Sequence, residues 1–179
     1  MMLTRSEWAA ALAALGIAGL LMAMNRRAVA SGAVLSKIAI RDRAAAAIDR
    51  HGFTVDPALA ANIAMVESGG DPSAARFEPF VPHVGGPDVS TGLMQVLKST
   101  AFWLATDMGY RAYGSADLGE RMLDPEIGLY FGLAYLDYLG RYRGEVRGEA
   151  WIVQSYNAGP GNAQLAYLAK YRAEQARGF

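Results

Sequence analysis

The chain has 179 residues and no formal net charge at pH 7, with 17 basic and 17 acidic side chains. Its length favours one domain, or one domain plus a small appendage. A chain that is 53% hydrophobic and 19% charged is too apolar for intrinsic disorder and lacks the positive field of a general nucleic-acid-binding protein, so both classes are excluded. Without cysteine and with only His51 and His83, it cannot form disulfides or a metal site built from histidines alone.

The first predicted element is an apolar stretch from Trp8 to Met24, seventeen residues without a charge. Its length is at the lower limit for spanning a bilayer, and we expect residues 1–30 to form a hydrophobic anchor helix in a membrane or a protein assembly. A secretory signal peptide is the alternative, because Arg5 precedes the stretch and Ala28-Val29-Ala30 resembles a cleavage site. Basic residues follow the stretch, and the positive-inside rule would keep the rest of the chain in the cytoplasm.

A lead-in helix is predicted within residues 31–52, where apolar residues recur at helical spacing. The next helix is predicted over residues 57–68, because Asp56-Pro57 is a typical start signal and Gly69-Gly70 a typical stop. Residues 71–90 contain four prolines and two glycines, which is typical of a long functional loop or an irregular hairpin.

A further helix is predicted from about Thr91 to Gly109. Asp124-Pro125 repeats the start signal and opens a stretch that is apolar around most of its circumference, as expected of a helix in the centre of a domain. The last two helices are predicted on either side of a breaker over residues 157–161. No alternating strand pattern is longer than about four residues. The predicted fold class is therefore mainly α, with room for a small hairpin, in a domain over residues 53–179.

Glu67 is a candidate catalytic acid on its position alone. At about 100° per residue, it lies within about 40° of Ile63 and 20° of Ala60, near the apolar stripe of its helix. Partial burial and the helix C-terminus both disfavour the charged carboxylate and raise its pKa. A raised pKa suits a general acid near neutral pH. Periodicity alone also fits an ordinary solvated glutamate at a helix end.

Four blocks succeed one another along the chain: ESGGDP at 67–72, STGLMQVLKSTA at 90–101, LDPEIGLYFGLAYL at 123–136 and SYNAGPGNA at 155–163. In this order they resemble the successive motifs of the lytic transglycosylase family with the soluble-transglycosylase (SLT) domain. The resemblance implies a lysozyme-like, goose-type helical domain that cleaves the β-1,4 bond between N-acetylmuramic acid and N-acetylglucosamine in peptidoglycan. It implies no metal and no organic cofactor.

The resemblance also implies the site residues. Glu67 matches the family's catalytic glutamate. The positions that match its substrate-binding residues are Ser68 beside that glutamate, the groove-lining pair Met94 and Gln95, Tyr135 of the core helix, and the polar pair Tyr156 and Asn157. On this basis we expect Tyr135 to orient and desolvate the acid, and the polar pair to position the acetamido group of the substrate.

The mechanism is expected to use one carboxylate. A glycosidase with two carboxylates needs a second one across the scissile bond, and the candidates Asp71, Glu78 and Asp88 all fall in the expected loop, without a helix to hold them. In the expected reaction, Glu67 protonates the leaving oxygen and then accepts the proton of the C6 hydroxyl as it attacks C1. The product is a 1,6-anhydromuramoyl end.

Two rival functions stay open. A hydrolytic lysozyme on the same fold would use water in place of the C6 hydroxyl, and a non-catalytic protein would only grip glycan strands within a larger machine. The expected partners are peptidoglycan strands and, through the N-terminal helix, a membrane or the proteins of a virion or secretion machine, with no nucleic acid. The expected locations are the bacterial cell envelope, with an inner-membrane anchor, or a phage virion.

Overall fold

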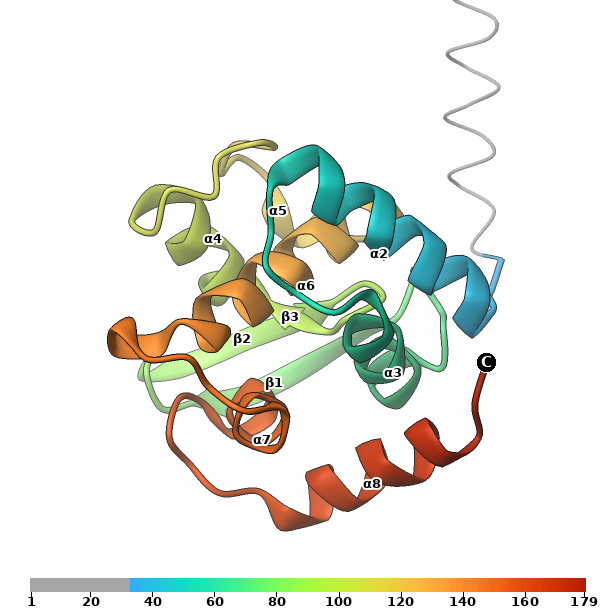
Figure 1. The fold of residues 1–179 in the computed structure, drawn as a ribbon. Helices are drawn as coiled ribbons and strands as arrows, with labels where there is room; N and C mark the ends of the chain where they lie inside the picture. Colours follow the sequence, from blue (N-terminus) through green and yellow to red (C-terminus); the bar gives the residue numbers. More distant parts are fainter. Residues whose placement is uncertain (1–32) are drawn as a thin grey trace, which may run out of the picture. The chain divides into compact units, whose positions relative to one another are not determined.

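The centre of the fold in the computed structural model is helix α6, Pro125–Gly140, which is buried along most of its length. Asp124 caps it, accepting hydrogen bonds from the backbone N–H groups of Glu126 and Ile127. This confirms the start signal and the central position expected from the sequence. The structure describes residues 33–179, and within them α6 packs against helices on several sides and against the sheet (Figure 1).

The other helices surround α6 and build a mainly α fold, as predicted. Their bounds are α2 Lys37–His51, α3 Pro57–Ser68, α4 Lys98–Thr106, α5 Leu118–Arg121, the short 3-10 helix η1 Tyr142–Gly144, α7 Glu149–Ala158 and α8 Leu165–Ala176. The core consists of aliphatic and aromatic side chains contributed by nearly all of these elements. Burial of this apolar surface is the main stabilising contribution to the fold.

Helix α3 has the bounds predicted from its capping signals. The side chain of Asp56 accepts a hydrogen bond from Ala58 N, with Pro57 in the first turn, and Gly69 ends the helix in the left-handed conformation at φ 64°. Gly70, at φ 86°, must stay a glycine, because a Cβ there would meet the backbone of Leu35. The chain therefore turns sharply directly after Glu67 and Ser68.

Residues 75–97 form a three-stranded antiparallel sheet, with β1 Ala75–Val81, β2 Gly86–Thr91 and β3 Val96–Leu97 in that order. The long loop expected over residues 71–90 was wrong, and the alternative of an irregular hairpin is what forms, with a register shift between Glu78 and Val81. The helix expected from Thr91 was wrong at its start, since Thr91 ends β2 and α4 begins at Lys98. A glycine turn at Gly92 and the pairing of β2 with β3 override the local helical pattern there.

The chain divides into two units, residues 1–32 and 33–179. The predicted anchor helix within residues 1–30 lies outside the described residues. No helix within 33–179 has the length and apolar character needed to span a membrane. Helix α2 packs against α3 and α6, with Ile40 and Ala44 fully buried, so the boundary expected at residue 52 falls inside the second unit.

Candidate active site

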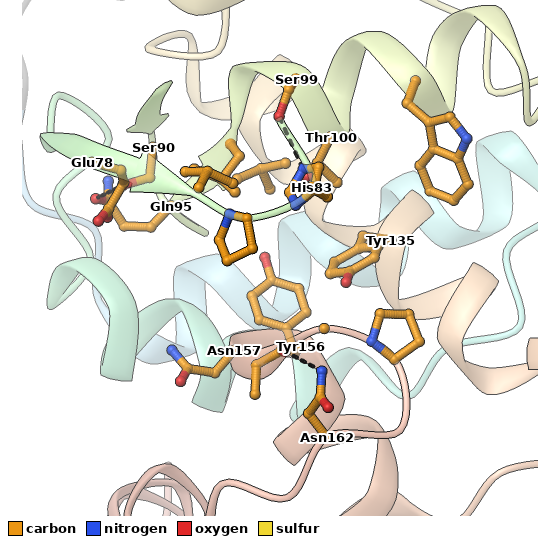
Figure 2. Close-up of a pocket in the computed structure, with 18 of the residues that line it drawn as sticks. Glu78, His83, Ser90, Gln95, Ser99, Thr100, Tyr135, Tyr156, Asn157 and Asn162 are labelled. Carbon is orange, nitrogen blue, oxygen red and sulfur yellow. Dashed lines mark hydrogen bonds between the residues drawn. The ribbon is translucent and has the colours of Figure 1, made fainter. Parts of the chain in front are cut away.

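A cleft of about 700 Å³ lies between the sheet and helices α3, α4, α6 and α7. Figure 2 shows Glu78, Ser90 and Gln95 close together on the sheet side of this cleft, with Tyr156 and Asn157 on the helical side. Glu67 also lines it, from the last turn of α3. The cleft therefore brings together residues as far apart in the sequence as Glu67 and Asn162.

The carboxyl group of Glu67 has a raised pKa, as predicted. Burial is the largest cause, because removing the group from water disfavours its charged form. The negative charge of Glu78 acts in the same direction, while a hydrogen bond from Tyr167 and the positive charges of Arg76 and Lys170 oppose it. A carboxyl group of this kind stays protonated closer to neutral pH and can donate its proton.

Tyr167 holds Glu67 from behind the cleft. Its hydroxyl donates a hydrogen bond of 2.6 Å to Oε1 of Glu67, and its side chain is buried. Helix α8 carries Tyr167 and packs against α3 and α7, and a partly desolvated ion pair of 3.3 Å between Lys37 and Glu174 fastens α8 to α2. Sequence reasoning missed this tyrosine, because nothing in the apolar pattern of the last helix distinguishes it from a core residue.

Ser68 and Met94 do not line the cleft. Each instead contacts another segment of the protein behind the cleft wall. The hydroxyl of Ser68 lies 2.8 Å from the carbonyl oxygen of Leu93 and accepts a hydrogen bond from Gly70 N. The side chain of Met94 is fully buried against Gly132 of α6, so its expected groove-lining position was wrong. Its flexible apolar side chain fills the space that the glycine leaves.

Gln95 and Tyr156 both reach the cleft, and both are engaged with the backbone. The amide nitrogen of Gln95 donates to the carbonyl oxygens of Ala74 and Gly92. The hydroxyl of the buried Tyr156 donates to the carbonyl oxygen of Met94 at 2.8 Å. These bonds fix the turn that carries the Gly-Leu-Met-Gln motif, with Gln95 itself at φ 47°. Both residues therefore shape the wall of the cleft.

Tyr135 and Asn157 present their side chains to the cleft. Tyr135 stands on α6 with its ring centroid 5.3 Å from that of Tyr156, and burial raises the pKa of its hydroxyl. The tyrosine that hydrogen-bonds the acid is Tyr167, so the orienting role expected of Tyr135 falls to another residue. Asn157 is exposed at the end of α7, where its amide is accessible from the cleft.

The three carboxylates considered as a second catalytic group differ in position. Asp71 caps the turn at Ser73, and Asp88 accepts a hydrogen bond from Ser99 N at 3.1 Å. Only Glu78 among the three lines the cleft, where strand β1 holds it and Arg76 pairs with it at 2.6 Å. Glu78 is therefore held in place by a strand, and the expectation that nothing in residues 71–90 would fix a carboxylate was wrong for this residue. Within residues 33–179, no three His, Cys, Asp or Glu side chains gather as a metal site would require.

Comparison with known proteins identifies the family. A family model described as the transglycosylase SLT domain matches residues 45–177, most of the chain. The chain is a member of the SLT domain family. This confirms the resemblance found in the sequence, and a lysozyme-like arrangement fits the mainly helical structure of this SLT domain.

Two curated relatives carry the name soluble lytic murein transglycosylase, from Escherichia coli strain K12 and from Escherichia coli O157:H7. Each is 32% identical over 91 residues, which are 51% of this chain and 13% of the relative. The solved structure of the 70 kDa soluble lytic transglycosylase from Escherichia coli is 26% identical, with a TM-score of 0.49 over 73% of this chain and 19% of that one. The SLT domain protein therefore spans a small part of the length of these relatives.

Proposed function

We propose that this SLT domain protein is a lytic transglycosylase that cleaves the β-1,4 bond between N-acetylmuramic acid and N-acetylglucosamine in peptidoglycan. The observation that carries the proposal is the carboxyl group of Glu67, which lines the cleft and has a pKa raised chiefly by burial. A carboxyl group in that state can act as a general acid near neutral pH. Membership of the family and the names of its relatives support the same reaction.

The proposed reaction has two steps. Glu67 first protonates the glycosidic oxygen, and the bond between this oxygen and C1 breaks while the substrate's 2-acetamido carbonyl stabilises the positive centre. The C6 hydroxyl oxygen then attacks C1 and its proton passes to Glu67, which restores the acid. The atoms balance without water, and the product is a 1,6-anhydromuramoyl end.

The other matched residues receive roles that fit their contacts. Asn157 is exposed beside the cleft, and we assign it the positioning of the acetamido group. Tyr135 excludes water from the neighbourhood of the acid. Ser68, Met94 and Gln95 hold the wall of the cleft through the hydrogen bonds and packing described above, and Tyr156 joins them through its hydroxyl.

Glu78 favours a second candidate function, hydrolysis by a lysozyme on the same fold. Its carboxylate lines the same cleft as Glu67, and a second carboxylate could activate a water molecule for attack on C1. Its ion pair with Arg76 opposes this role, because the guanidinium already occupies Oε1 of the carboxylate. We therefore prefer the transglycosylase.

The test is digestion of purified peptidoglycan by the full chain beside its Glu67→Gln variant, with the soluble products weighed by mass spectrometry. Anhydro ends from the wild type alone are the expected result. Products heavier by one water would establish the hydrolase, and a Glu78→Gln variant would then be inactive. No release by either protein, with binding retained, would support the non-catalytic glycan-binding alternative.

We further propose that residues 1–30 locate the enzyme, either in the cell envelope through an inner-membrane anchor or in a phage virion or secretion machine. The support is the uncharged stretch from Trp8 to Met24. Fractionation of cells that express the full chain and a variant without residues 1–30 tests this proposal. A membrane fraction that loses the protein on truncation would support the anchor, and an unchanged distribution would contradict it.

A further inference from the structure

Arg76 is a cation on the sheet side of the cleft that the proposed reaction does not use. It lies on β1 and lines the cleft with 63% of its side chain exposed. Among the hydrogen bonds within residues 33–179, its side chain contributes only Nε, which donates to Oε1 of Glu78 at 2.6 Å. The two terminal nitrogens of a guanidinium form a second edge with the spacing of a carboxylate. This edge is left for a ligand.

The hairpin holds Arg76 in this orientation. Arg76 is opposite Ser90 in the pairing of β1 with β2, and the hydroxyl of Ser90 lies 3.4 Å from Glu78 Oε1 and 3.1 Å from Gln95 Oε1. The single hydroxyl proton of Ser90 has Gln95 Oε1 as its nearer acceptor, so strand β1 is what holds Glu78. Glu78 in turn holds Nε of the arginine. A guanidinium that is already oriented loses less entropy when it binds a ligand.

The charges around the acid favour an anionic ligand. The side chains whose charges act on Glu67 are Arg76, Lys170 and Glu78, so two cations stand against one anion when Glu67 is protonated. Arg76 and Glu67 line the same cleft. A negative group bound at Arg76 would therefore lie in the cleft that holds the reacting sugar.

Resting on the proposed function, we infer that Arg76 binds a carboxylate attached to the muramic sugar on its lactyl side. The sugar rings of the glycan are neutral, so a cation can select only the groups that this side carries. Two sources supply the same chemistry: a carboxylate of the peptide stem, or the lactyl carboxylate itself on strands that have lost their stems. The site is a specificity site of the cleft, and Glu78 is its positioning residue.

The test measures binding of soluble, uncrosslinked glycan strands to the full chain carrying Glu67→Gln, with and without Arg76→Gln. The Glu67→Gln background removes cleavage and removes any effect of Arg76 on the pKa of the acid. Three probes are used: strands with intact stems, the same strands with every carboxylate converted to its amide, and strands stripped of their stems. Arg43→Gln, an exposed arginine of α2 outside the cleft, is the matched control.

Arg76→Gln is expected to weaken binding about tenfold for a probe that carries the recognised carboxylate, because a charge-assisted pair is lost. If the variant loses affinity for strands with intact stems, Arg76 binds the stem carboxylate. If it loses affinity for stripped strands, Arg76 binds the lactyl carboxylate. The amidated strands should bind both proteins equally and weakly. Arg43→Gln should leave every dissociation constant unchanged.

The inference would be overturned if Arg76→Gln weakened binding of amidated strands equally, or if it weakened binding of none of the probes. It would also be overturned if the Glu67→Gln chain bound no strands. Arg76→Lys separates charge from geometry, since it keeps the charge without the planar edge, and an intermediate affinity is expected. Failure of the proposed function would appear in the digestion assay, as absence of cleavage by the wild type. The comparison of dissociation constants would remain valid in that case.

Discussion

The hydroxyl of Tyr167 donates a hydrogen bond of 2.6 Å to Oε1 of Glu67, although 100 residues separate the two in the chain. Tyr167 is buried and does not line the cleft, so it approaches the acid from the protein interior. The bond occupies one oxygen of the carboxyl group and leaves Oε2 for the substrate. The last helix of the chain thus decides how the proposed acid is oriented.

Replacing Tyr167 by phenylalanine should reduce the cleavage rate about tenfold, because the hydrogen bond that orients Glu67 is lost. The bond lowers the pKa of Glu67, so its loss should raise that pKa further. The limb of the pH-rate profile on which the acid loses its proton should then move to higher pH. Initial rates of muropeptide release across the pH range measure both effects.

Tyr171→Phe is the control for this change. Tyr171 is a buried tyrosine one turn further along α8 and does not line the cleft. The Tyr171→Phe variant should have a lower free energy of unfolding than the wild type, with an unchanged pH-rate profile. An equal shift in both variants would mean that Tyr167 acts through the packing of α8 and not through its bond to the acid.

Glu67→Gln should stabilise the fold in a pH-dependent manner. Glu67 has a raised pKa in the folded protein. Below its unfolded pKa of 4.5 the carboxyl group is neutral in both the folded and the unfolded protein, so it does not lower the free energy of unfolding. The cost of burying its charge grows as the pH rises from that value to the folded pKa and is constant above it. The variant should therefore gain stability over the wild type across this window.

Urea unfolding at about pH 4 and at about pH 8 measures this difference. Glu120→Gln, an exposed glutamate on α5, is the control for exchanging a carboxylate on the surface. A Glu67→Gln variant that is less stable than the wild type at the higher pH would show that burial does not penalise the charge.

Tyr156→Phe should lower the free energy of unfolding by about 1–3 kcal/mol, because the carbonyl oxygen of Met94 would lose its buried donor. Since this bond fixes the turn before Gln95, cleavage should also decrease. Denaturant unfolding and the release assay measure the two effects. Unchanged stability would indicate that water replaces the hydroxyl.

Gly132→Ala should destabilise the protein by about 1–2 kcal/mol, even though alanine is the better helix former. A Cβ at this position would collide with the Sδ, Cβ and Cε atoms of Met94, whose side chain is fully buried. Gly140→Ala is the matched control on the same helix, because its Cβ would meet only Ile152 Cδ1 at 3.9 Å. Thermal unfolding of both variants tests the contrast, and equal melting temperatures would contradict it.

Local signals in the sequence predicted the helices well where capping decides their bounds. Asp56-Pro57 and Asp124-Pro125 start α3 and α6 in the structure, since an aspartate side chain and a proline act within one turn of the chain. The environment of Glu67 followed from its place on the apolar side of α3, and its raised pKa is confirmed. The site roles assigned to its neighbours remain proposals.

The sequence by itself determined the family, the mainly α class, the helix that carries Glu67 and the direction of its pKa shift, because caps, periodicity and motifs act over a few residues. Only the tertiary structure decided that Met94 is buried, that Tyr167 holds the acid, and that Arg76 and Glu78 line the cleft. Each of these depends on pairing and packing between distant segments. Such contacts form when apolar surface is buried in three dimensions, and no local pattern encodes which partners meet.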